Sequence, residues 1–480
     1  MGNHSSDSPY PLPARRPDKP PQRSRPTSPH LRRRWLAYLS SFVLLLGATG
    51  IMAGGTWVAT RWLLDQEAPE WIERWFPRDR TLSVRGLSNP ETLAEIQLKL
   101  KQNNYLAGAA VSLGSNRSFL DGHTQVTEFL LPVLRQQVTC QPNCNEIAEL
   151  RLYQAVPQHK GDKVKEKRFF QIRQVAIANL EEAVIVASLI ESDNLGASRS
   201  MAFTRLEAFD ANVPAKGIWL NLSGTTQRQN LAITYGRVLL YNPERYHLSS
   251  LLEWVSPAGQ LPTWEKSDRS LPDLVVNQSQ GLEPHYKIYR VEQSLFLPNP
   301  TRLQAVSLLE PALDQPGYKT ALLLARSGLW STSLRWMQSF KQSRSPRSRE
   351  WNTTSEAQLR LIRKHAAIAR TQAEQVWASA SQQVLANLLD GRWKPALQVL
   401  QTSEDAASEI ATLLQADNGR LHSRIQVALR LEPTNRDIKA WATLLIAAKY
   451  KREAAIAWLK RQPKTSEADI DYISSFLLKI

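Results

Sequence analysis

The sequence has very few cysteines and lacks the short motifs that mark the commonest enzyme sites. Its 480 residues contain no GxxxxGK(S/T) phosphate loop, no GxSxG nucleophile elbow, no HExxH zinc motif and no Cys-x2-Cys pair. The eight histidines are too far apart to form a metal-binding pair on one face of a helix. We therefore expect a protein that is not an enzyme and that binds no metal or other cofactor.

Charge is absent from residues 35–60, the longest uncharged stretch of the chain. As an α-helix, its 26 residues would be about 39 Å long, enough to cross a hydrocarbon core of about 30 Å. We interpret residues 35–62 as a single transmembrane helix that acts as an uncleaved signal anchor. A cleaved signal peptide is the alternative, although its apolar core is usually only about 7–15 residues long.

The charges beside this stretch predict its orientation. Arg32, Arg33 and Arg34 precede it, whereas Asp65 and Glu67 follow it. Because cytoplasmic flanks carry the excess of arginine and lysine, we expect the N-terminus in the cytoplasm and the bulk of the chain in the periplasm, a lumen or the extracellular space. The sequence thus predicts a single-pass protein of the cell membrane, in contact with the lipid bilayer.

The only two cysteines, Cys140 and Cys144, lie on the predicted outer side in the sequence CQPNC. Oxidising conditions there allow disulfides to persist, so we expect a bond between these two residues. A structural zinc site would need about four ligands, and a Cys-x3-Cys pair supplies only two of them. Free thiols are the remaining alternative.

Composition divides the chain into five segments, and their expected elements give an α+β fold class. Residues 1–34 hold eight prolines and seven arginines and are expected to form a disordered, basic, Pro-rich cytoplasmic tail. The transmembrane helix at 35–62 would be followed by a membrane-proximal mixed segment at 63–147. A β-rich outer domain at 148–298 and a C-terminal helical domain at 299–480 complete the prediction.

Short β-rich runs separated by turn clusters predict a sandwich or an open barrel in residues 148–298. Residues 218–222 and 233–239 flank one loop, and we expect them to pair as a hairpin. Two other runs, at 183–190 and 248–255, fit a helix as well as a strand by periodicity alone.

A run without glycine or proline, residues 355–389, predicts one long helix, and Gly391 follows it where a C-terminal cap belongs. Its apolar positions are alternately three and four residues apart, which is typical of a heptad seam. The seam comprises Leu359, Ile362, Ala366, Ala369, Ala373, Val376 and Ala380. Two shorter helices, broken around residues 379–381, are the alternative.

Parts of residues 315–462 resemble tetratricopeptide repeats. The sequences Gly328-Leu329-Trp330 and Gly391-Arg392-Trp393 share the small-x-aromatic turn that begins the second helix of such a repeat. The run 428–435, followed by Trp441, is similar to the junction between two repeats. The resemblance implies stacked helical hairpins that create a protein-binding surface, in an array that is degenerate because the two turns are 63 residues apart rather than 34. An irregular helical bundle is the alternative.

An excess of positive charge indicates what the helical domain binds. The chain has a formal net charge of +16, and ten arginines and lysines lie between residues 326 and 374 together with only three glutamates. Such an excess attracts acidic partners. The sequence therefore predicts an anchored extracytoplasmic scaffold that docks an acidic protein of a membrane or envelope complex, and we expect no nucleic-acid partner.

Seven residues are candidates for the docking face. They are the cations Arg360, Arg363, Lys364 and Arg370 and the aromatic anchors Trp336, Trp351 and Trp377. Arginine and tryptophan are enriched where binding energy is concentrated. Each cation could instead belong to a solvated helix face, and each tryptophan to the core. The alternative function is binding or hydrolysis of an anionic envelope glycan by the β-rich domain.

Overall fold

The computed structural model describes most of the chain beyond residue 88. The described residues are 89–114, 128–136, 145–156, 166–187, 199–228, 231–267, 271–293, 301–343, 351–402 and 406–479. They all belong to one of the two units into which the chain divides, Asp79–Ile480. The predicted tail, the stretch at 35–62 and the two cysteines lie outside the described residues.

The predicted fold class is corrected in one respect. Helices and antiparallel sheets do form an α+β fold, but no helix within the described residues is long and apolar enough to cross a membrane. The longest of these helices, α7 (Thr353–Glu374), has 22 residues and carries charged side chains on successive turns, including Glu356, Arg363 and Arg370. Such charges are costly in hydrocarbon. The fold class is therefore α+β without an assigned transmembrane helix.

Most of the described strands form three antiparallel sheets, which we call the first, second and third sheets. The first sheet has the order β1-β6-β5-β4-β2 with β3 beside β4, the second β12-β11-β10-β9, and the third β13-β14-β15-β16; β7 pairs with β8 separately. The bounds are β1 (Glu91–Thr92), β2 (Tyr105–Ala107), β3 (Val111–Ser112), β4 (Glu128–Gln136), β5 (Asn145–Ala155), β6 (Arg168–Ala176), β7 (Leu180–Glu181), β8 (Ser200–Met201), β9 (Arg205–Ala208), β10 (Ile218–Arg228), β11 (Leu231–Asn242), β12 (His247–Ser256), β13 (Thr263–Glu265), β14 (Asp273–Asn277), β15 (Tyr286–Gln293) and β16 (Thr301–Ala305).

Among the described residues, helices interrupt and follow the strands. Two helices lie among the strands: α3 (Leu93–Gln102) and α4 (Glu182–Ala187). A 3-10 turn, η1 (Pro243–Arg245), connects β11 to β12. The helices after the last strand, besides α7, are α5 (Pro316–Arg326), α6 (Trp330–Gln342), α8 (Ala380–Asp390), α9 (Trp393–Thr402), α10 (Ala406–Gln415), α11 (Arg420–Leu431), α12 (Arg436–Lys449), α13 (Arg452–Lys460) and α14 (Glu467–Leu477).

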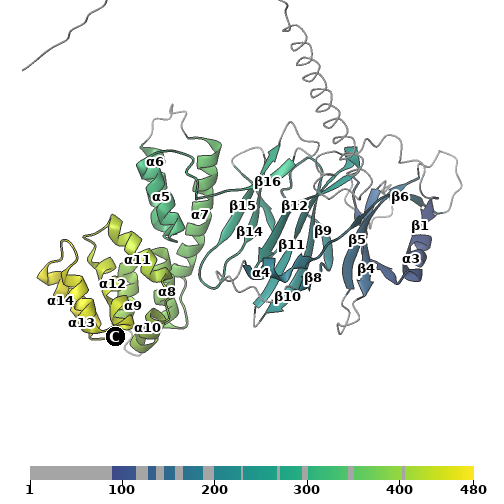
Figure 1. Cartoon of the computed structure of the whole chain (residues 1–480). Helices are drawn as coiled ribbons and strands as arrows, with labels where there is room; N and C mark the ends of the chain where they lie inside the picture. The colour runs from purple at the N-terminus through teal and green to yellow at the C-terminus, as the bar shows by residue number, and fades with distance from the viewer. Residues whose placement is uncertain are drawn as a thin grey trace, which may run out of the picture. The chain divides into compact units, whose positions relative to one another are not determined.

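The three sheets are stacked as layers, with the second sheet in the middle (Figure 1). Along β10, Leu220 and Leu222 pack against the first sheet, whereas Trp219 packs against the third. Successive side chains of a strand point to opposite faces, and on β10 both sets are apolar. The second sheet is therefore covered on both sides by other sheets.

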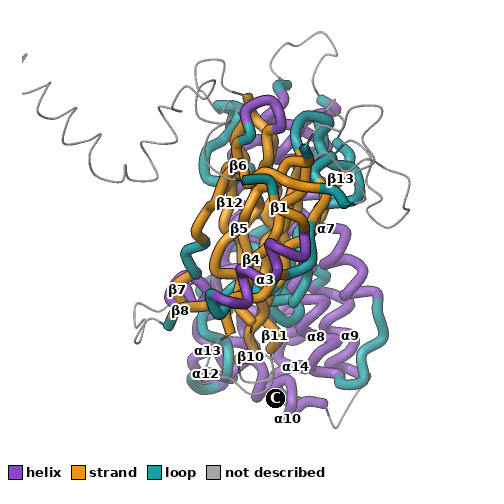
Figure 2. The backbone as a smooth tube through the Cα atoms, turned by 90° about the vertical axis from the view of Figure 1, so that its right-hand side faces the viewer, coloured by secondary structure: helices purple, strands orange, loops and turns teal. Residues whose placement is uncertain are grey.

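One helix covers each outer face of this stack. Figure 2 shows α3 across the first sheet, where Ile96 and Leu100 pack in one core with Phe129 of β4. On the third sheet, Val275 and Ile288 share a small apolar cluster with Leu361 of α7. The layers thus follow one another as helix, three sheets and helix, and the remaining helices pack beyond α7 (Figure 1).

The secondary structure tests three expectations, for the hairpin and for the two runs that fit a helix or a strand equally well. The predicted hairpin is confirmed, because β10 and β11 pair from Ile218 opposite Tyr241 to Arg228 opposite Leu231. The two ambiguous runs differ: residues 182–187 form the helix α4, whereas residues 247–256 form the strand β12.

The prediction of one long helix at 355–389 is wrong. Helix α7 ends at Glu374, where Gln375 adopts an extended backbone, and α8 begins after Ser379, whose hydroxyl accepts a hydrogen bond from the Gln382 backbone N–H. The seam is buried in α7 up to Ala373, but Val376 in the break is 91% exposed. The break therefore follows the alternative of two helices, and the predicted cap is confirmed, because Gly391 has a φ of 75° after the end of α8.

Both small-x-aromatic turns stand at the start of a helix. Trp330 is the first residue of α6, and Trp393 is the first residue of α9. Gly328 has a φ of +78°, and a Cβ atom there would lie 2.1 Å from a guanidinium nitrogen of Arg424. Trp441 is fully buried and donates its indole N–H to the carbonyl of Trp393 at 3.0 Å. The resemblance to tetratricopeptide repeats stays a prediction.

We predict that Gly236→Ala destabilises the protein. Gly236 lies on the buried second sheet, and a Cβ atom there would lie 2.3 Å from the carbonyl oxygen of Leu222 and 2.6 Å from the Trp254 ring. Relieving this overlap requires movement in a packed core, so we expect a loss of about 2–3 kcal/mol in the free energy of unfolding. Denaturant titration measures it. Gly281→Ala is the control, because nothing lies within 4 Å of the added Cβ and only the backbone cost of its positive φ of 56°, about 1 kcal/mol, is expected. Equal losses in the two variants would contradict the steric explanation.

Candidate docking groove

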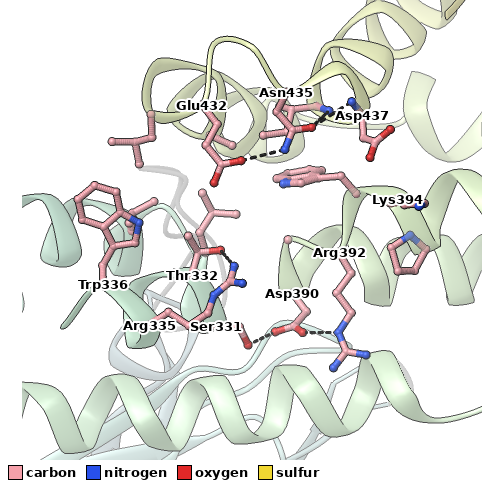
Figure 3. Close-up of a pocket in the computed structure, with 18 of the residues that line it drawn as sticks. Ser331, Thr332, Arg335, Trp336, Asp390, Arg392, Lys394, Glu432, Asn435 and Asp437 are labelled. Carbon is pink, nitrogen blue, oxygen red and sulfur yellow. Dashed lines mark hydrogen bonds and ion pairs between the residues drawn. The ribbon is translucent and has the colours of Figure 1, made fainter. Parts of the chain in front are cut away.

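A groove opens where three helix–helix turns of the C-terminal region meet (Figure 3). Its walls come from the start of α6, the end of α7, the turn between α8 and α9, and the turn between α11 and α12. The enclosed volume is about 590 Å3. We call this space the first hollow. Its charged lining residues are the cations Arg335, Arg370, Arg392 and Lys394 and the acids Glu374, Asp390, Glu432 and Asp437.

Each of the four carboxylates in the first hollow has a partner within the chain. Arg392 pairs with Asp390 and with Glu374, at 2.8 Å in both cases. The side-chain amide of Asn435 donates to Glu432 at 2.8 Å, and the hydroxyl of Tyr472 donates to Asp437 at 3.0 Å. Asp390 also accepts a hydrogen bond from the hydroxyl of the buried Ser331 (Figure 3).

The cations are less completely compensated. Within the part of the chain that the structure describes, no carboxylate pairs with Arg335, Arg370 or Lys394, and all three side chains are exposed. Arg335 donates only a long hydrogen bond, 3.4 Å, to the hydroxyl of Thr332. Glu374 and Asp390 pair with a cation, whereas Glu432 and Asp437 have neutral partners and keep their negative charge. Arg335, Arg370 and Lys394 can each still pair with an anion supplied from outside the chain, because they are exposed and no carboxylate of the described residues pairs with them.

Trp336 lies at the rim of the first hollow and is 41% exposed (Figure 3). A second hollow of about 550 Å3 is also lined by Trp336. Four residues line both spaces: Thr332, Arg335, Trp336 and Glu432. The two hollows therefore form one groove that passes over the exposed face of α6.

Two of the predicted cations face the third sheet rather than the groove. Arg360 forms an ion pair with the buried Asp273 of β14, and Lys364 forms one with Glu265 of β13 at 2.6 Å. Lys364 also lies 5.1 Å from the centre of the Tyr286 ring. Both cations thus hold α7 against the sheet, and we no longer consider them candidates for partner binding.

The other two predicted cations are exposed on α7. Arg370 lines the first hollow, close to the end of the helix. Arg363 is exposed but does not line either hollow. Of the four predicted cations, the structure therefore brings only Arg370 into the groove.

The three predicted tryptophans also separate. Trp336 is at the groove, as described above. Trp351 packs against Tyr318 and donates its indole N–H to Glu356 at 2.6 Å, and Trp377 donates its indole N–H to the carbonyl of Gln372 at 2.8 Å. Both of these rings are partly buried and serve the local structure of α7 and its neighbours. The predicted disulfide partners, Cys140 and Cys144, lie outside the described residues.

Sequence reasoning missed Arg335 and Lys394 as candidates. Lys394 directly follows the Gly391-Arg392-Trp393 turn, and Arg335 lies within the first turns of the helix that follows the other such turn. The starts of α6 and α9, which follow the two turns, both line the first hollow. Cations just after each turn could therefore have indicated the site from the sequence, whereas the predicted long helix could not.

His365 is the third contact that joins α7 to the third sheet. Its Nε2 accepts a hydrogen bond from the backbone N–H of Tyr286 at 2.8 Å, and its Nδ1 lies 2.8 Å from the carbonyl oxygen of Leu361, which fixes the proton on Nδ1. The ring stacks on Trp330 with 3.9 Å between centres. Burial lowers the pKa of His365 to about 4, and the nearby His285 and Lys364 act in the same direction.

Comparison with known proteins found no matching family model, curated protein or solved structure. The function of the chain must therefore be inferred from the chemistry of the groove and of the contacts that hold it in place.

We predict that Arg360→Ala is strongly destabilising and that Arg363→Ala is not. Removing Arg360 takes a paired cation away from Asp273, which is 1% exposed, and we expect a loss of about 3 kcal/mol in the free energy of unfolding. Arg363 is exposed three residues away, so its removal should cost less than about 0.5 kcal/mol. Adding Asp273→Asn to Arg360→Ala should recover part of the loss, because the neutral asparagine does not need the cation that Arg360 supplied. Equal stability of the two single variants would contradict the assigned ion pair.

We also predict a loss of stability in acid that depends on His365. Its pKa is about 4 in the fold and about 6.5 when unfolded, so the unfolded chain binds the proton more readily. The stabilisation is complete above pH 6.5 and falls by about 3 kcal/mol as the pH drops from 6.5 to 4. Unfolding measured across this range should show a flatter profile in His365→Gln, whose amide oxygen still accepts from Tyr286. The exposed His422 provides the control, and an unchanged profile in His365→Gln with a changed one in His422→Gln would refute the assignment.

Proposed function

We propose that the helical region is a docking module and that it binds an acidic segment of a partner protein in the groove. The observation that carries this proposal is a set of three exposed cations, Arg335, Arg370 and Lys394, that line the first hollow beside Trp336 and have no carboxylate partner among the described residues. The chain then acts as a scaffold rather than as an enzyme.

The exposed Trp336 supplies the apolar part of the binding surface. Tryptophan and arginine are the residue types most enriched where truncation costs the most binding energy. In the groove, Trp336 and Arg335 are consecutive residues on α6 and line both hollows. The cations speed association with an acidic partner, and burial of the indole ring slows dissociation.

The contacts of α7 support this function by holding the groove in one shape. Arg370 and Glu374 of α7 line the first hollow, while Arg360 and Lys364 of the same helix are paired to the third sheet. Trp330, which begins α6, stacks on His365 of α7. A binding surface that is already ordered loses less conformational entropy when it binds.

The sheets offer less support for the glycan alternative. The second sheet is covered on both faces by the other two, and α3 and α7 pack on the outer faces of the stack. The strands thus use their faces for packing, in contrast to the open groove of the helical region.

We predict that a triple variant, Arg335→Glu, Arg370→Glu and Lys394→Glu, loses partner binding without losing its fold. The three side chains are exposed, so the melting temperature should stay nearly unchanged, while recovery of a co-purifying acidic protein should fall at least tenfold. Recovery by the unmodified chain should also weaken with salt. Quantitative mass spectrometry of material retained by the tagged chain measures both effects.

The matched control reverses three exposed cations outside the groove, Arg363, Lys451 and Lys460, which gives the same change in net charge. Equal recovery by both triple variants would show that only overall charge matters. Loss of a bound polysaccharide, rather than a protein, in the groove variant would replace the proposed partner with an anionic glycan.

A further inference from the structure

The two hollows of the groove differ in chemistry. The first hollow holds the three cations without a carboxylate partner. The second hollow adds Gly317, Ser339, Phe340 and Ser343 to the four shared residues, and none of these additions is charged. Its most apolar lining groups are the rings of Phe340 and Trp336. An anionic region and an apolar region of a ligand would thus be received in two neighbouring hollows, both lined by Trp336.

The second hollow is shaped by a glycine. Gly317 lies in the first turn of α5, and a Cβ atom there would lie 3.1 Å from the Phe340 ring. The absence of a side chain lets the Phe340 ring lie against the start of α5. Phe340 also contacts the buried Tyr318 edge to face, with 5.7 Å between ring centres. The apolar wall of this hollow is therefore fixed in position by neighbours in the core.

We infer that the docked segment is an extended peptide that crosses Trp336, with acidic side chains in the first hollow and an apolar side chain in the second. This inference rests on the proposed function and specifies the chemistry of its ligand. The two spaces adjoin the same residues, Thr332, Arg335 and Trp336, so one chain that passes over these side chains can reach both. A segment of about eight residues, roughly 27 Å when extended, is long enough to make both sets of contacts.

The polar lining favours an extended backbone over a helical one. Thr332 lines both hollows and Ser339 lines the second, and both residues carry a hydroxyl that can form hydrogen bonds. A helix satisfies its own backbone hydrogen bonds and is about 10 Å wide, whereas an extended chain has free N–H and C=O groups for such hydroxyls. Its side chains also alternate in direction, which separates residues that enter the groove from residues that face solvent.

The test uses two fluorescent peptides of about eight residues and the full-length chain, with affinity measured by fluorescence polarisation. Both peptides carry glutamate and aspartate at one end; the other end has two leucines in the first peptide and two serines in the second. We expect the leucine peptide to bind about tenfold more tightly, because a leucine side chain that enters the second hollow removes its apolar surface from water. Both peptides should lose binding to the triple groove variant described above.

A substitution that fills the second hollow separates its contribution from that of the cations. In Ser339→Trp the leucine peptide should lose its tenfold advantage and bind as the serine peptide does. Gln338→Trp is the matched control, since Gln338 is exposed on the same helix but does not line either hollow, and it should keep the advantage.

Three results would overturn the inference. Equal affinity for both peptides, or an advantage that survives Ser339→Trp, would show that the second hollow takes no part; an acidic partner bound at the cations alone would remain. Tight binding of the leucine peptide to the triple groove variant would remove the acidic requirement. If neither peptide binds the unmodified chain, the extended-peptide inference fails, while the docking function is decided separately by recovery of the partner protein.

Discussion

Helix α7 has to satisfy two neighbours at once, and the arrangement of the helical region depends on this constraint. One side of the helix places Leu359 and Ile362 in a core with α5 and α6. The other side meets the third sheet through Leu361 and through the pairs that Arg360 and Lys364 form. Apolar residues of α7 that are three and four positions apart pack against α5 and α6, whereas charged residues between them reach the third sheet.

His365 makes this junction specific. An apolar side chain could fill the same space, but it could not accept the hydrogen bond from the half-buried backbone N–H of Tyr286 at the start of β15. The ring also stacks on Trp330 at the beginning of α6. One side chain therefore connects the sheet, the helix α7 and the helix that carries Arg335 and Trp336.

Local features of the fold were predictable from the sequence because the signals and the structure lie within a few residues of each other. The hairpin of β10 and β11 and the left-handed cap at Gly391 are examples. The end of α7 was missed because no glycine or proline marks it; the break is instead held by side chains, with the Trp377 backbone N–H donating to Gln383 at 3.3 Å. A sequence does not show which amide will satisfy an exposed backbone group.

The candidate site was harder to predict because its parts are distant in sequence. Arg360 and Arg363 are the same residue type and only three positions apart. Arg360 nevertheless pairs with an aspartate 87 residues earlier in the chain, whereas Arg363 is exposed. Charge counting correctly indicated a basic helical region but could not tell which cations were already neutralised. Similarly, only the three-dimensional arrangement distinguishes Trp336 in the groove from Trp351, which packs against Tyr318.

The order of the layers matches the order of the chain, and this has a consequence for synthesis. The first sheet with α3, then the second sheet, then the third sheet, and then α5, α6 and α7 follow one another from the N-terminus to the C-terminus. Each layer therefore emerges from the ribosome with one apolar face bare until the next segment arrives to cover it. Most of the contacts formed at each step join neighbouring segments, so the chain can be assembled progressively from its N-terminal side. A pause in translation just before α7 would leave Val275 and Ile288 uncovered and is the stage at which a nascent chain would need protection from aggregation.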